Sequence, residues 1–461
     1  MPTAQVRVKK PQPLVSAECR AVAGQVAGLM GRGTVKLKLA YGKKGLYVDL
    51  PDDLNVEIVA PKYVQGLQDQ AGAVRNALRR PIRAKPLKEL VSPSGTVAIV
   101  VNDITRPTPY NVILPVLLNE LGHVPDDQVI VFIATGTHRR NTEAELREML
   151  GTEILARYQI IQNDARDRDS HTLVGTTSSG NDVWMHSQYV KCDVRILTGF
   201  IEPHFFAGFS GGGKACMPGL ALVDTVLKNH SPQNIDNPMA TWGVTHGNPV
   251  WEEIREAALM VQPSFLLNVT LNRDKQITAV FAGDLEEAHA QGCRFAKASA
   301  MVPVKEPYDI VITSNSGYPL DLNLYQSVKG MSAAAQVVKD GATIIIAADC
   351  WDGIPQHGQY GKLLREAESA ASLLGIIRTQ NFVRQDVWQA QIHARICQKA
   401  DVYFYSENLS AEQIESAWLK PCHSIEATVD ELLAKYGRDA SICVLPEGPQ
   451  TIPYIRKRNV T

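Results

Sequence analysis

Thr96-Val-Ala-Ile-Val-Val-Asn-Asp103 is a run of mainly β-branched residues that ends in two polar side chains. A continuous apolar run of this length is typical of a parallel strand that is buried on both faces. Gln128-Val-Ile-Val-Phe-Ile-Ala134 repeats the pattern and is followed by Thr135-Gly-Thr-His138. Because residues 112–121 have helical apolar spacing, the region is predicted to be a β-α-β unit. Ligands of open α/β sheets bind where such strands end.

Similar patterns continue along the chain in both directions. Val194-Arg-Ile-Leu-Thr198 is another candidate for a buried strand, and it runs into a glycine-rich loop. Residues 35–50 alternate apolar and polar side chains around a turn, which predicts a β-hairpin. Beyond residue 303, buried-strand patterns alternate with helical ones, with strands expected at 309–314, 343–347 and 401–405 and helices around 333–338 and 366–374.

These patterns predict two α/β domains with mainly parallel sheets and an active site in the cleft between them. A chain of 461 residues is too long for a single ordinary core. Residues 1–34 are expected to be an N-terminal extension, 35–298 an N-terminal domain that carries the glycine-rich loop, and 299–435 a C-terminal domain. The tail, 436–461, contains a strand pattern from residue 442 and is expected to return to the N-terminal domain.

Composition narrows the classes of function. The 47 basic and 48 acidic side chains give a formal charge of −1, so nothing indicates binding to nucleic acid or to an anionic membrane surface. The longest apolar runs are far shorter than a membrane span. No secretory signal is visible at the N-terminus, and the eight cysteines form no regular framework, so a cytoplasmic protein with reduced thiols is expected.

Ile201-Glu-Pro-His-Phe-Phe-Ala-Gly-Phe-Ser-Gly-Gly-Gly-Lys214 is the most informative loop of the chain. A glycine-rich turn lets backbone N–H groups approach an anion such as phosphate. Gly208 to Lys214 matches the first part of a P-loop, but Ala215 replaces the Ser or Thr that would hold magnesium. Since an ordinary nucleotide-hydrolysing P-loop is therefore disfavoured, a covalent bond between Lys214 and a cofactor becomes a candidate role.

Five segments together resemble one family, the nickel-pincer lactate racemases and related 2-hydroxyacid racemases and epimerases. They are Asn102-Asp-Ile-Thr-Arg-Pro107, Thr135-Gly-Thr-His-Arg139, the loop from Glu202 to Lys214, His230, and Leu324-Tyr-Gln-Ser-Val-Lys-Gly330. The resemblance implies reversible hydride transfer through a 2-keto intermediate. It also implies a nickel-pincer nucleotide, nickel pyridinium-3-thioamide-5-thiocarboxylic acid mononucleotide, covalently bound to a lysine.

The resemblance assigns a role to each matching residue of this chain. Lys214 would carry the cofactor and His230 would ligate nickel, as suits a tetragonal nickel(II) site with an imidazole ligand. His138 and His204 would be the two catalytic acid/bases, since imidazole suits both roles near neutral pH. The remaining positions would bind the cofactor (Asp103, Ser210, Gly211, Gly212, Gly213, Tyr325, Trp388) or the substrate carboxylate (Arg106, Gln326, Lys329).

Two other classes of function stay open at this point. A metal-dependent hydrolase would use His138, His204 and His230 as ligands around an open water site. A non-catalytic protein that binds the pincer cofactor would need the lysine and the nickel ligand but no acid/bases. The expected partners are a small 2-hydroxyacid, lactate or a relative of it, and the proteins that build the cofactor; the sequence leaves racemase versus epimerase and homo-oligomerisation undecided.

Overall fold

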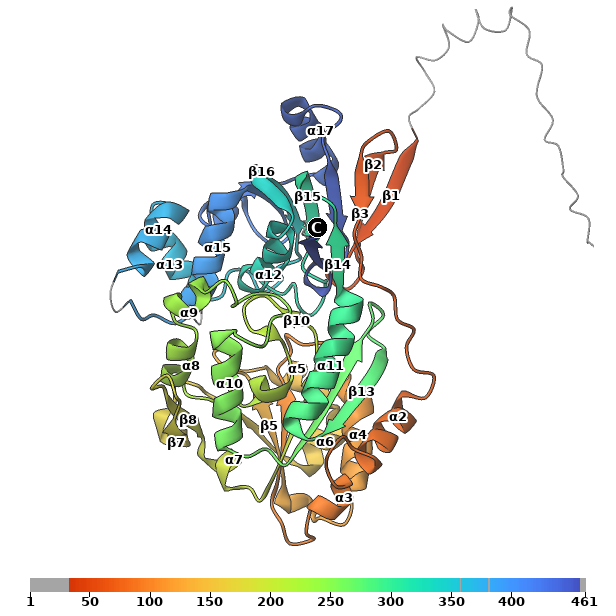
Figure 1. The fold of residues 1–461 in the computed structure, drawn as a ribbon, viewed down its shortest axis with the longest axis vertical. Helices are drawn as coiled ribbons and strands as arrows, with labels where there is room; N and C mark the ends of the chain where they lie inside the picture. Colours follow the sequence, from red (N-terminus) through yellow and green to blue (C-terminus); the bar gives the residue numbers. More distant parts are fainter. Residues whose placement is uncertain (1–32, 357, 380–381, 457–461) are drawn as a thin grey trace, which may run out of the picture.

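A computed structural model describes residues 33–356, 358–379 and 382–456, which form two α/β lobes stacked along the long axis of the molecule (Figure 1). Each lobe is built on a six-stranded sheet. The fold class predicted from the sequence, two α/β domains with mainly parallel sheets, is confirmed. No helix among the described residues is long and apolar enough to span a membrane.

The sheet of the first domain has the strand order β13-β12-β9-β4-β5-β6. Its strands are β4 (Val97–Asn102), β5 (Val129–Ala134), β6 (Gln159–Gln162), β9 (Val194–Phe200), β12 (Phe265–Leu271) and β13 (Ile277–Gly283). All neighbouring pairs are parallel except β12 and β13. The side chains of β4 alternate between the two cores of the domain, since Val97, Ile99 and Val101 enter one and Ala98 and Val100 the other. Helix α4 (Tyr110–Glu120) connects the parallel neighbours β4 and β5, so the expected β-α-β unit is present.

Helices cover both faces of this first sheet (Figure 1). They include α2 (Gln70–Arg79), α4 (Tyr110–Glu120), α5 (Glu143–Leu150), α6 (Thr152–Arg157), α8 (Val223–Asn229), α10 (Pro249–Met260) and α11 (Leu285–Ala300). A capping box begins α5: the Thr142 hydroxyl accepts from the Glu145 backbone N–H, and the Glu145 carboxylate accepts from the Thr142 N–H. A small hairpin, β7 (His171–Thr176) and β8 (Asp182–His186), lies at the side of the domain.

The sheet of the second domain has the order β18-β17-β16-β15-β19-β3, and every pair in it is parallel. Its strands are β3 (Val56–Ile58), β15 (Tyr308–Ser314), β16 (Val338–Ala347), β17 (Asp401–Tyr405), β18 (Lys420–Pro421) and β19 (Ile442–Leu445). The helices of this domain include α12 (Leu324–Ala335), α13 (Tyr360–Glu366), α14 (Ala370–Ile377), α15 (Val387–Lys399) and α17 (Ile425–Tyr436).

Two segments lie in the second domain although the sequence placed them in the first. The predicted hairpin, β1 (Thr34–Leu39) and β2 (Leu46–Pro51), forms as expected, but its apolar face packs with α17 against the second sheet. The predicted strand in the tail is β19, which pairs with β15 and β3 and so does not return to the first domain. Both segments are far in sequence from β15, and local apolar patterns carry no information on which sheet a strand joins.

Two helix boundaries also differ from the expectation. The helix expected around 333–338 ends at Ala335, and β16 begins at Val338. The stretch expected to be helical at 366–374 is divided between α13 and α14, with Ser369 as the N-cap of the second helix. Ser369 favours the start of a new helix over the continuation of α13, because its hydroxyl accepts a hydrogen bond from the backbone N–H of Ser372.

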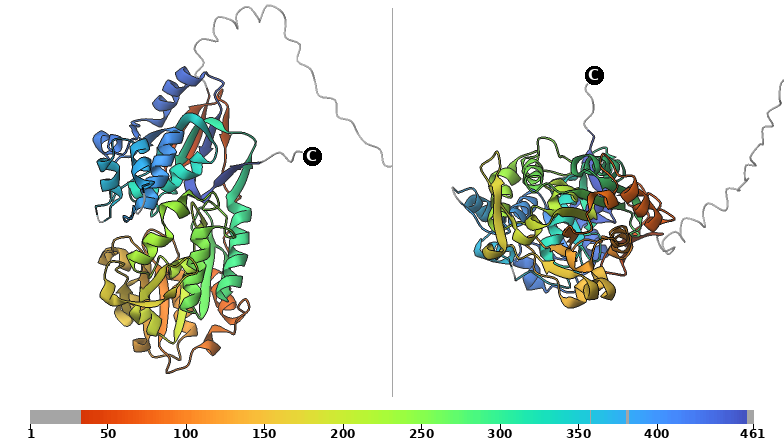
Figure 2. Two further views of the ribbon diagram at one scale, coloured as in Figure 1. Left: turned by 60° about the vertical axis from the view of Figure 1, so that its left-hand side comes forward. Right: turned by 90° about the horizontal axis from the view of Figure 1, so that it is seen from below.

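The chain passes between the domains where α11 ends and β14 (Met301–Val304) begins, and β14 pairs with the last described strand, β20 (Ile452–Ile455). Figure 2 shows α11 spanning the side of the lower lobe towards this junction. The carboxyl ends of β9, β4 and β5 are neighbours in the first sheet and face the second domain. The fold thus brings three strand ends against the start of α12 and α15.

A candidate active site between the two domains

A cavity between the domains is lined by twelve of the fourteen site residues that the sequence singled out. The first domain supplies residues after β4, β5 and β9, and the second supplies residues from the first turns of α12 and α15. The twelve residues are Asp103, Arg106, His138, His204, Ser210, Gly211, Lys214, His230, Tyr325, Gln326, Lys329 and Trp388. Residues more than 280 positions apart in the sequence therefore meet at one site.

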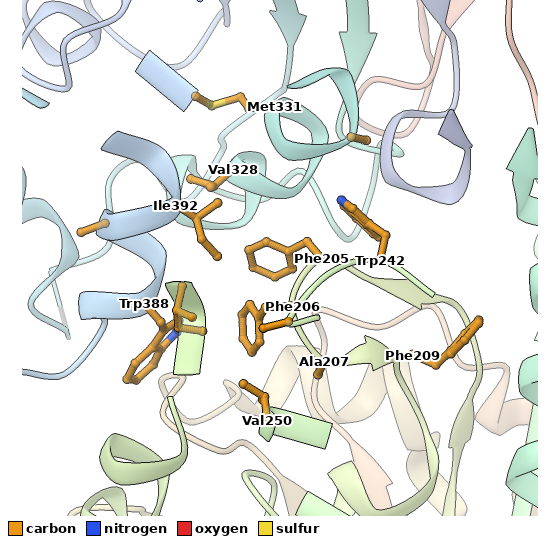
Figure 3. Close-up of a cluster of buried hydrophobic side chains, with 14 of the residues drawn as sticks. Phe205, Phe206, Ala207, Phe209, Trp242, Val250, Val328, Met331, Trp388 and Ile392 are labelled. Carbon is orange, nitrogen blue, oxygen red and sulfur yellow. The ribbon is translucent and has the colours of Figure 1, made fainter. Parts of the chain in front are cut away.

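Apolar packing closes the cavity between the two domains. Figure 3 shows Phe205 and Phe206 from the loop after β9 directed towards Val328 of α12 and towards Ile392 and Trp388 of α15. The ring of His204 lies against Phe206, with centroids 4.6 Å apart. Apolar groups around the site lower the local dielectric constant, which strengthens the electrostatic interactions among the charged side chains inside.

Asp103 fixes the orientation of His138. The Oδ2 atom of Asp103 lies 2.6 Å from Nδ1 of His138, while Oδ1 accepts from the backbone N–H and the hydroxyl of Thr105. Burial raises the pKa of Asp103, but His138, Arg106 and Thr105 together lower it to about 2. Because an ionised carboxylate only accepts hydrogen bonds, the Nδ1 of His138 carries a proton.

The other nitrogen of His138 points towards the second domain. Its Nε2 atom lies 3.2 Å from Nε2 of Gln326, and the Oε1 of the same amide accepts from Nζ of Lys329 at 2.7 Å. Since Lys329 only donates, the amide nitrogen of Gln326 must face His138. His138 is therefore a neutral imidazole whose Nε2 lone pair is directed into the site, which is the form a general base requires.

His204 holds its proton on the opposite nitrogen. Its Nδ1 accepts from the backbone N–H of Ala207 at 3.2 Å, which leaves the proton of the neutral ring on Nε2. Burial lowers the pKa of His204 well below its ordinary value, and the positive charges of Lys214, Lys329 and Arg106 lower it further. The two candidate acid/bases thus rest in different tautomers within one cavity.

Lys214 presents an amine without a partner. Among the described residues, its Nζ atom makes no hydrogen bond or ion pair, and it lies 5.7 Å from the centroid of the Phe206 ring. Burial and then the charge of Arg106 lower the pKa of Lys214 from 10.5 to about 7. About half of the amine is therefore neutral and nucleophilic at neutral pH.

Arg106 and Lys329 act on one buried carboxylate, that of Glu202. Nε of Arg106 lies 4.0 Å from Oε1 of Glu202, and both side chains are largely buried. Burial raises the pKa of Glu202, which Arg106 and Lys329 oppose, while burial and Arg106 lower the pKa of Lys329. Arg106, Lys329 and Lys214 outnumber the single carboxylate of Glu202, so these basic side chains can bind an anion. Glu202 was quoted within the sequence motif without a role; its position two residues before His204 was the available signal.

The glycines of the loop lie in two different environments. Ser210 and Gly211 line the cavity, but Gly212 and Gly213 face away from it into the protein. A Cβ atom on Gly212 would lie 2.7 Å from the ring of His289, and one on Gly213 would lie 2.9 Å from Cβ of Ala258. These two glycines permit close packing on α11 and α10, so the structure does not bring them to the cavity as phosphate donors.

Tyr325 and Trp388 form a hydrogen-bonded pair on the wall of the second domain. Nε1 of Trp388 donates to the Tyr325 hydroxyl at 3.0 Å. The Trp388 ring meets the His230 ring edge to face, with centroids 5.0 Å apart, and Tyr325 meets His138 in the same way at 6.1 Å. Tyr325 and Trp388 therefore pack against the rings of two of the three histidines, His138 and His230.

The three histidines do not form a protein-only metal centre. No three His, Cys, Asp or Glu side chains of the described ranges are placed to hold one metal ion. Burial and then Lys214 lower the pKa of His230, so it is a neutral imidazole. A metal at His230 would need its other ligands from a bound group, a requirement that disfavours the hydrolase with three histidine ligands.

The fold and the site define an α/β protein with three histidines, a buried lysine without a hydrogen-bond partner among the described residues, and further basic side chains in one cleft between two domains. Comparison with known proteins identifies the family: residues 41–243 match the lactate racemase N-terminal domain, and residues 304–452 match the lactate racemase C-terminal domain. The chain belongs to the lactate racemase family, whose members are isomerases that use nickel.

Named relatives and solved structures agree with this placement. The chain is 36% identical to the lactate racemase of Thermoanaerobacterium thermosaccharolyticum over 90% of this chain and 98% of that protein. It is 35% identical to the lactate racemase of Lactiplantibacillus plantarum over the same shares. The structure of the lactate racemase apoprotein from T. thermosaccharolyticum superposes with a TM-score of 0.83 at 35% identity, covering 91% of this chain and 100% of that one.

Proposed function

We propose that this protein racemises or epimerises a 2-hydroxyacid, lactate or a related acid, by reversible hydride transfer through a 2-keto intermediate. The observation that carries the proposal is the Lys214 amine, which has no partner among the described residues and shares one cavity with His138, His204 and His230. A lysine left unpaired in such a site is suited to covalent attachment of a cofactor.

The residues of the cavity fit a nickel-pincer nucleotide. Lys214 would be the attachment point, His230 would offer an imidazole nitrogen to nickel, and Arg106 and Lys329 would balance anionic groups. When bound, this cofactor accepts the α-hydrogen of the substrate as a hydride and returns it. Ser210 and Gly211 are the part of the glycine-rich loop that lines the same cavity and could approach the nucleotide.

His138 is the better-prepared base. Asp103 holds the proton on Nδ1, so Nε2 can take the hydroxyl proton of the substrate, and the carboxylate then stabilises the imidazolium. In this structure, Gln326 donates to that Nε2, so the substrate hydroxyl must displace the amide. Lys329 holds the amide oxygen at 2.7 Å and can keep the displaced side chain near the substrate.

His204 serves the other face of the substrate, where it donates a proton to the keto oxygen or takes one in the reverse direction. Burial and three nearby cations lower the pKa of His204, which opposes its protonation. A substrate carboxylate bound at Arg106 and Lys329 would offset one of those positive charges, and acylation of the Lys214 amine would remove another. Binding therefore raises the pKa of His204 towards the range that proton transfer requires.

A racemisation assay tests this proposal. The protein, coexpressed with a pathway for the pincer cofactor and supplied with nickel, is incubated with single enantiomers of lactate and of longer, aromatic and dicarboxylic 2-hydroxyacids, and the products are separated by chiral chromatography. We expect nickel-dependent conversion of at least one acid and none with Lys214→Ala. Full activity in Lys214→Ala would refute the covalent-cofactor mechanism.

A non-catalytic cofactor-binding protein is the remaining alternative. It would have no use for a histidine whose tautomer is set by a buried carboxylate, as His138 is by Asp103. We propose the proteins that build the cofactor as partners, since they must make the cofactor and deliver it to Lys214. A loaded protein that binds nickel but converts no acid of the panel would favour the binding role.

A further inference from the structure

Glu253 is a buried carboxylate outside the cavity. It lies on α10 with 6% of its surface exposed, and no basic side chain of the described ranges forms a salt bridge with it. Moving an ionised carboxylate into the protein interior costs several kcal/mol unless hydrogen bonds replace its water. Such a group needs an explanation in the structure.

Four neutral donors satisfy this carboxylate. Its Oε2 accepts from the side-chain amides of Asn229 at 2.7 Å and Asn181 at 3.2 Å. Its Oε1 accepts from the hydroxyl of Thr177 at 3.0 Å and from that of Ser179. Three of the donors belong to the turn between β7 and β8, and the fourth, Asn229, is the neighbour of His230. The charge is solvated by the protein but not neutralised.

Asn229 connects this carboxylate to His230. Its amide nitrogen also donates to the carbonyl oxygen of Val250 at 3.2 Å, so both bonds require the amide nitrogen to face α10. The amide oxygen then lies 2.7 Å from Nδ1 of His230. An amide oxygen only accepts, so Nδ1 carries the proton and Nε2 keeps its lone pair. Nε2 makes no hydrogen bond to the described residues, and His230 lines the cavity.

We propose that Glu253 and Asn229 are positioning residues that hold His230 in the metal-binding tautomer and increase the donor strength of its Nε2. The inference rests on the proposed role of His230 as the nickel ligand. Metal-binding histidines commonly donate their second N–H to a carboxylate or carbonyl, which orients the ring and raises its basicity. Here a carboxylate acts through one amide, because chained hydrogen bonds polarise one another.

A purely structural role for Glu253 makes a different prediction. In that case, the carboxylate only ties the β7–β8 turn to α10, and the loss of its charge would affect stability without a specific effect on nickel. Thr177→Val is the matched control, because it removes one bond from the turn to Glu253 and leaves the bonds of Asn229 intact.

Glu253→Gln removes the charge and keeps the shape. The glutamine oxygen can face the two asparagine amides, which only donate, while its NH₂ faces the hydroxyls of Thr177 and Ser179, which can rotate to accept. Asn229→Ala removes the link itself. Each variant is coexpressed with the cofactor pathway, the adduct on Lys214 is quantified by peptide mass spectrometry, and the rate of nickel loss into a chelator is measured per adduct.

We expect an unchanged adduct and nickel loss about 10- to 100-fold faster in Glu253→Gln, with a similar or larger effect in Asn229→Ala. The double variant should lose nickel no faster than Asn229→Ala alone, because the carboxylate acts through the amide. Nickel loss within about twofold of the unsubstituted protein, loss as fast in Thr177→Val, or additive effects would overturn the inference.

A cofactor-free measurement keeps the inference separate from the proposed function. If Lys214 carries no adduct, the proposed function fails, and ¹⁵N spectra of histidine-labelled apoprotein test the tautomer directly. His230, assigned from a His230→Gln spectrum, should show a protonated Nδ1 and an unprotonated Nε2, and Asn229→Ala should abolish that preference. A mixture of tautomers in the unsubstituted protein would contradict the positioning role.

Discussion

Replacement of Asp103 by asparagine should reverse the tautomer of His138. Oδ1 of Asp103 accepts from both the backbone N–H and the hydroxyl of Thr105, so the oxygen of an asparagine would stay on that side. Its NH₂ group would then face Nδ1 of His138, where the carboxylate oxygen lies 2.6 Å away. Because the NH₂ group only donates, Nδ1 would become an acceptor and the proton would move to Nε2, which then could not act as a base.

The size of the effect follows from the role of His138. Loss of a positioned general base costs about 10²- to 10⁴-fold. We therefore expect kcat to fall by about 10²- to 10⁴-fold in Asp103→Asn, with KM changing much less.

Initial rates of racemisation at saturating substrate provide the assay, and each preparation is normalised to its adduct on Lys214 and its nickel content. Glu252→Gln is the control, since that carboxylate lies 3.7 Å from the exposed His246. A kcat of Asp103→Asn within about threefold of the unsubstituted protein, at equal loading, would refute the assignment of His138 as a base held by Asp103.

Three further predictions concern the same loop and its surroundings. His204→Gln should lower kcat by about 10²- to 10⁴-fold without loss of the Lys214 adduct, as measured by chiral chromatography and peptide mass spectrometry. Because the pKa of Lys214 is lowered to about 7, the neutral amine increases with pH, and the rate of adduct formation should rise about tenfold from pH 6 to pH 8 and then level off; a flat profile would contradict this. Gly213→Ala should cost about 1–3 kcal/mol, since its Cβ would lie 2.9 Å from Cβ of Ala258, and the effects of Gly213→Ala and Ala258→Gly on the thermal midpoint should be less than additive in the double variant.

The lowered pKa values of Asp103 and Lys214 both make stability rise with pH, but in two different pH windows. The folded pKa of Asp103 is lowered, so its contribution to stability is complete above its ordinary value of 3.8 and is lost as the pH falls towards 2. The folded pKa of Lys214 is lowered for a basic group, so unfolding is favoured as the pH falls from 10.5 to about 7, where the unfolded amine binds a proton that the folded one does not.

Local patterns predicted the central strands of the first sheet, β4, β5 and β9, and the helix between β4 and β5, but not β6, β12 or β13. The apolar run before Asn102 depends on neighbours in the sequence, and the strand forms as expected. Which sheet a strand joins depends on distant pairing, so the sequence misplaced the hairpin from Thr34 and the strand from Ile442. The resemblance to a family identified the residues of the cavity. It did not show which domain contains the hairpin and the last strand of the second sheet.

The candidate site shows the same limit. The motifs named His138, His204 and Lys214, but the tautomers follow from Asp103 and from the backbone of Ala207, whose contacts only the structure reveals. Four consecutive loop residues looked equivalent in sequence, yet Gly212 and Gly213 pack against neighbouring helices. Glycine is needed at both kinds of position, so the sequence alone could not separate them.

The most direct test of the account is peptide mass spectrometry of this protein after coexpression with a pincer-cofactor pathway and nickel, beside a lactate racemase as loading control. The account predicts an adduct of nucleotide size on Lys214 and on no other lysine. An unmodified Lys214 beside a loaded control would contradict it, since the unpaired amine in the cavity would then have no part in holding the cofactor.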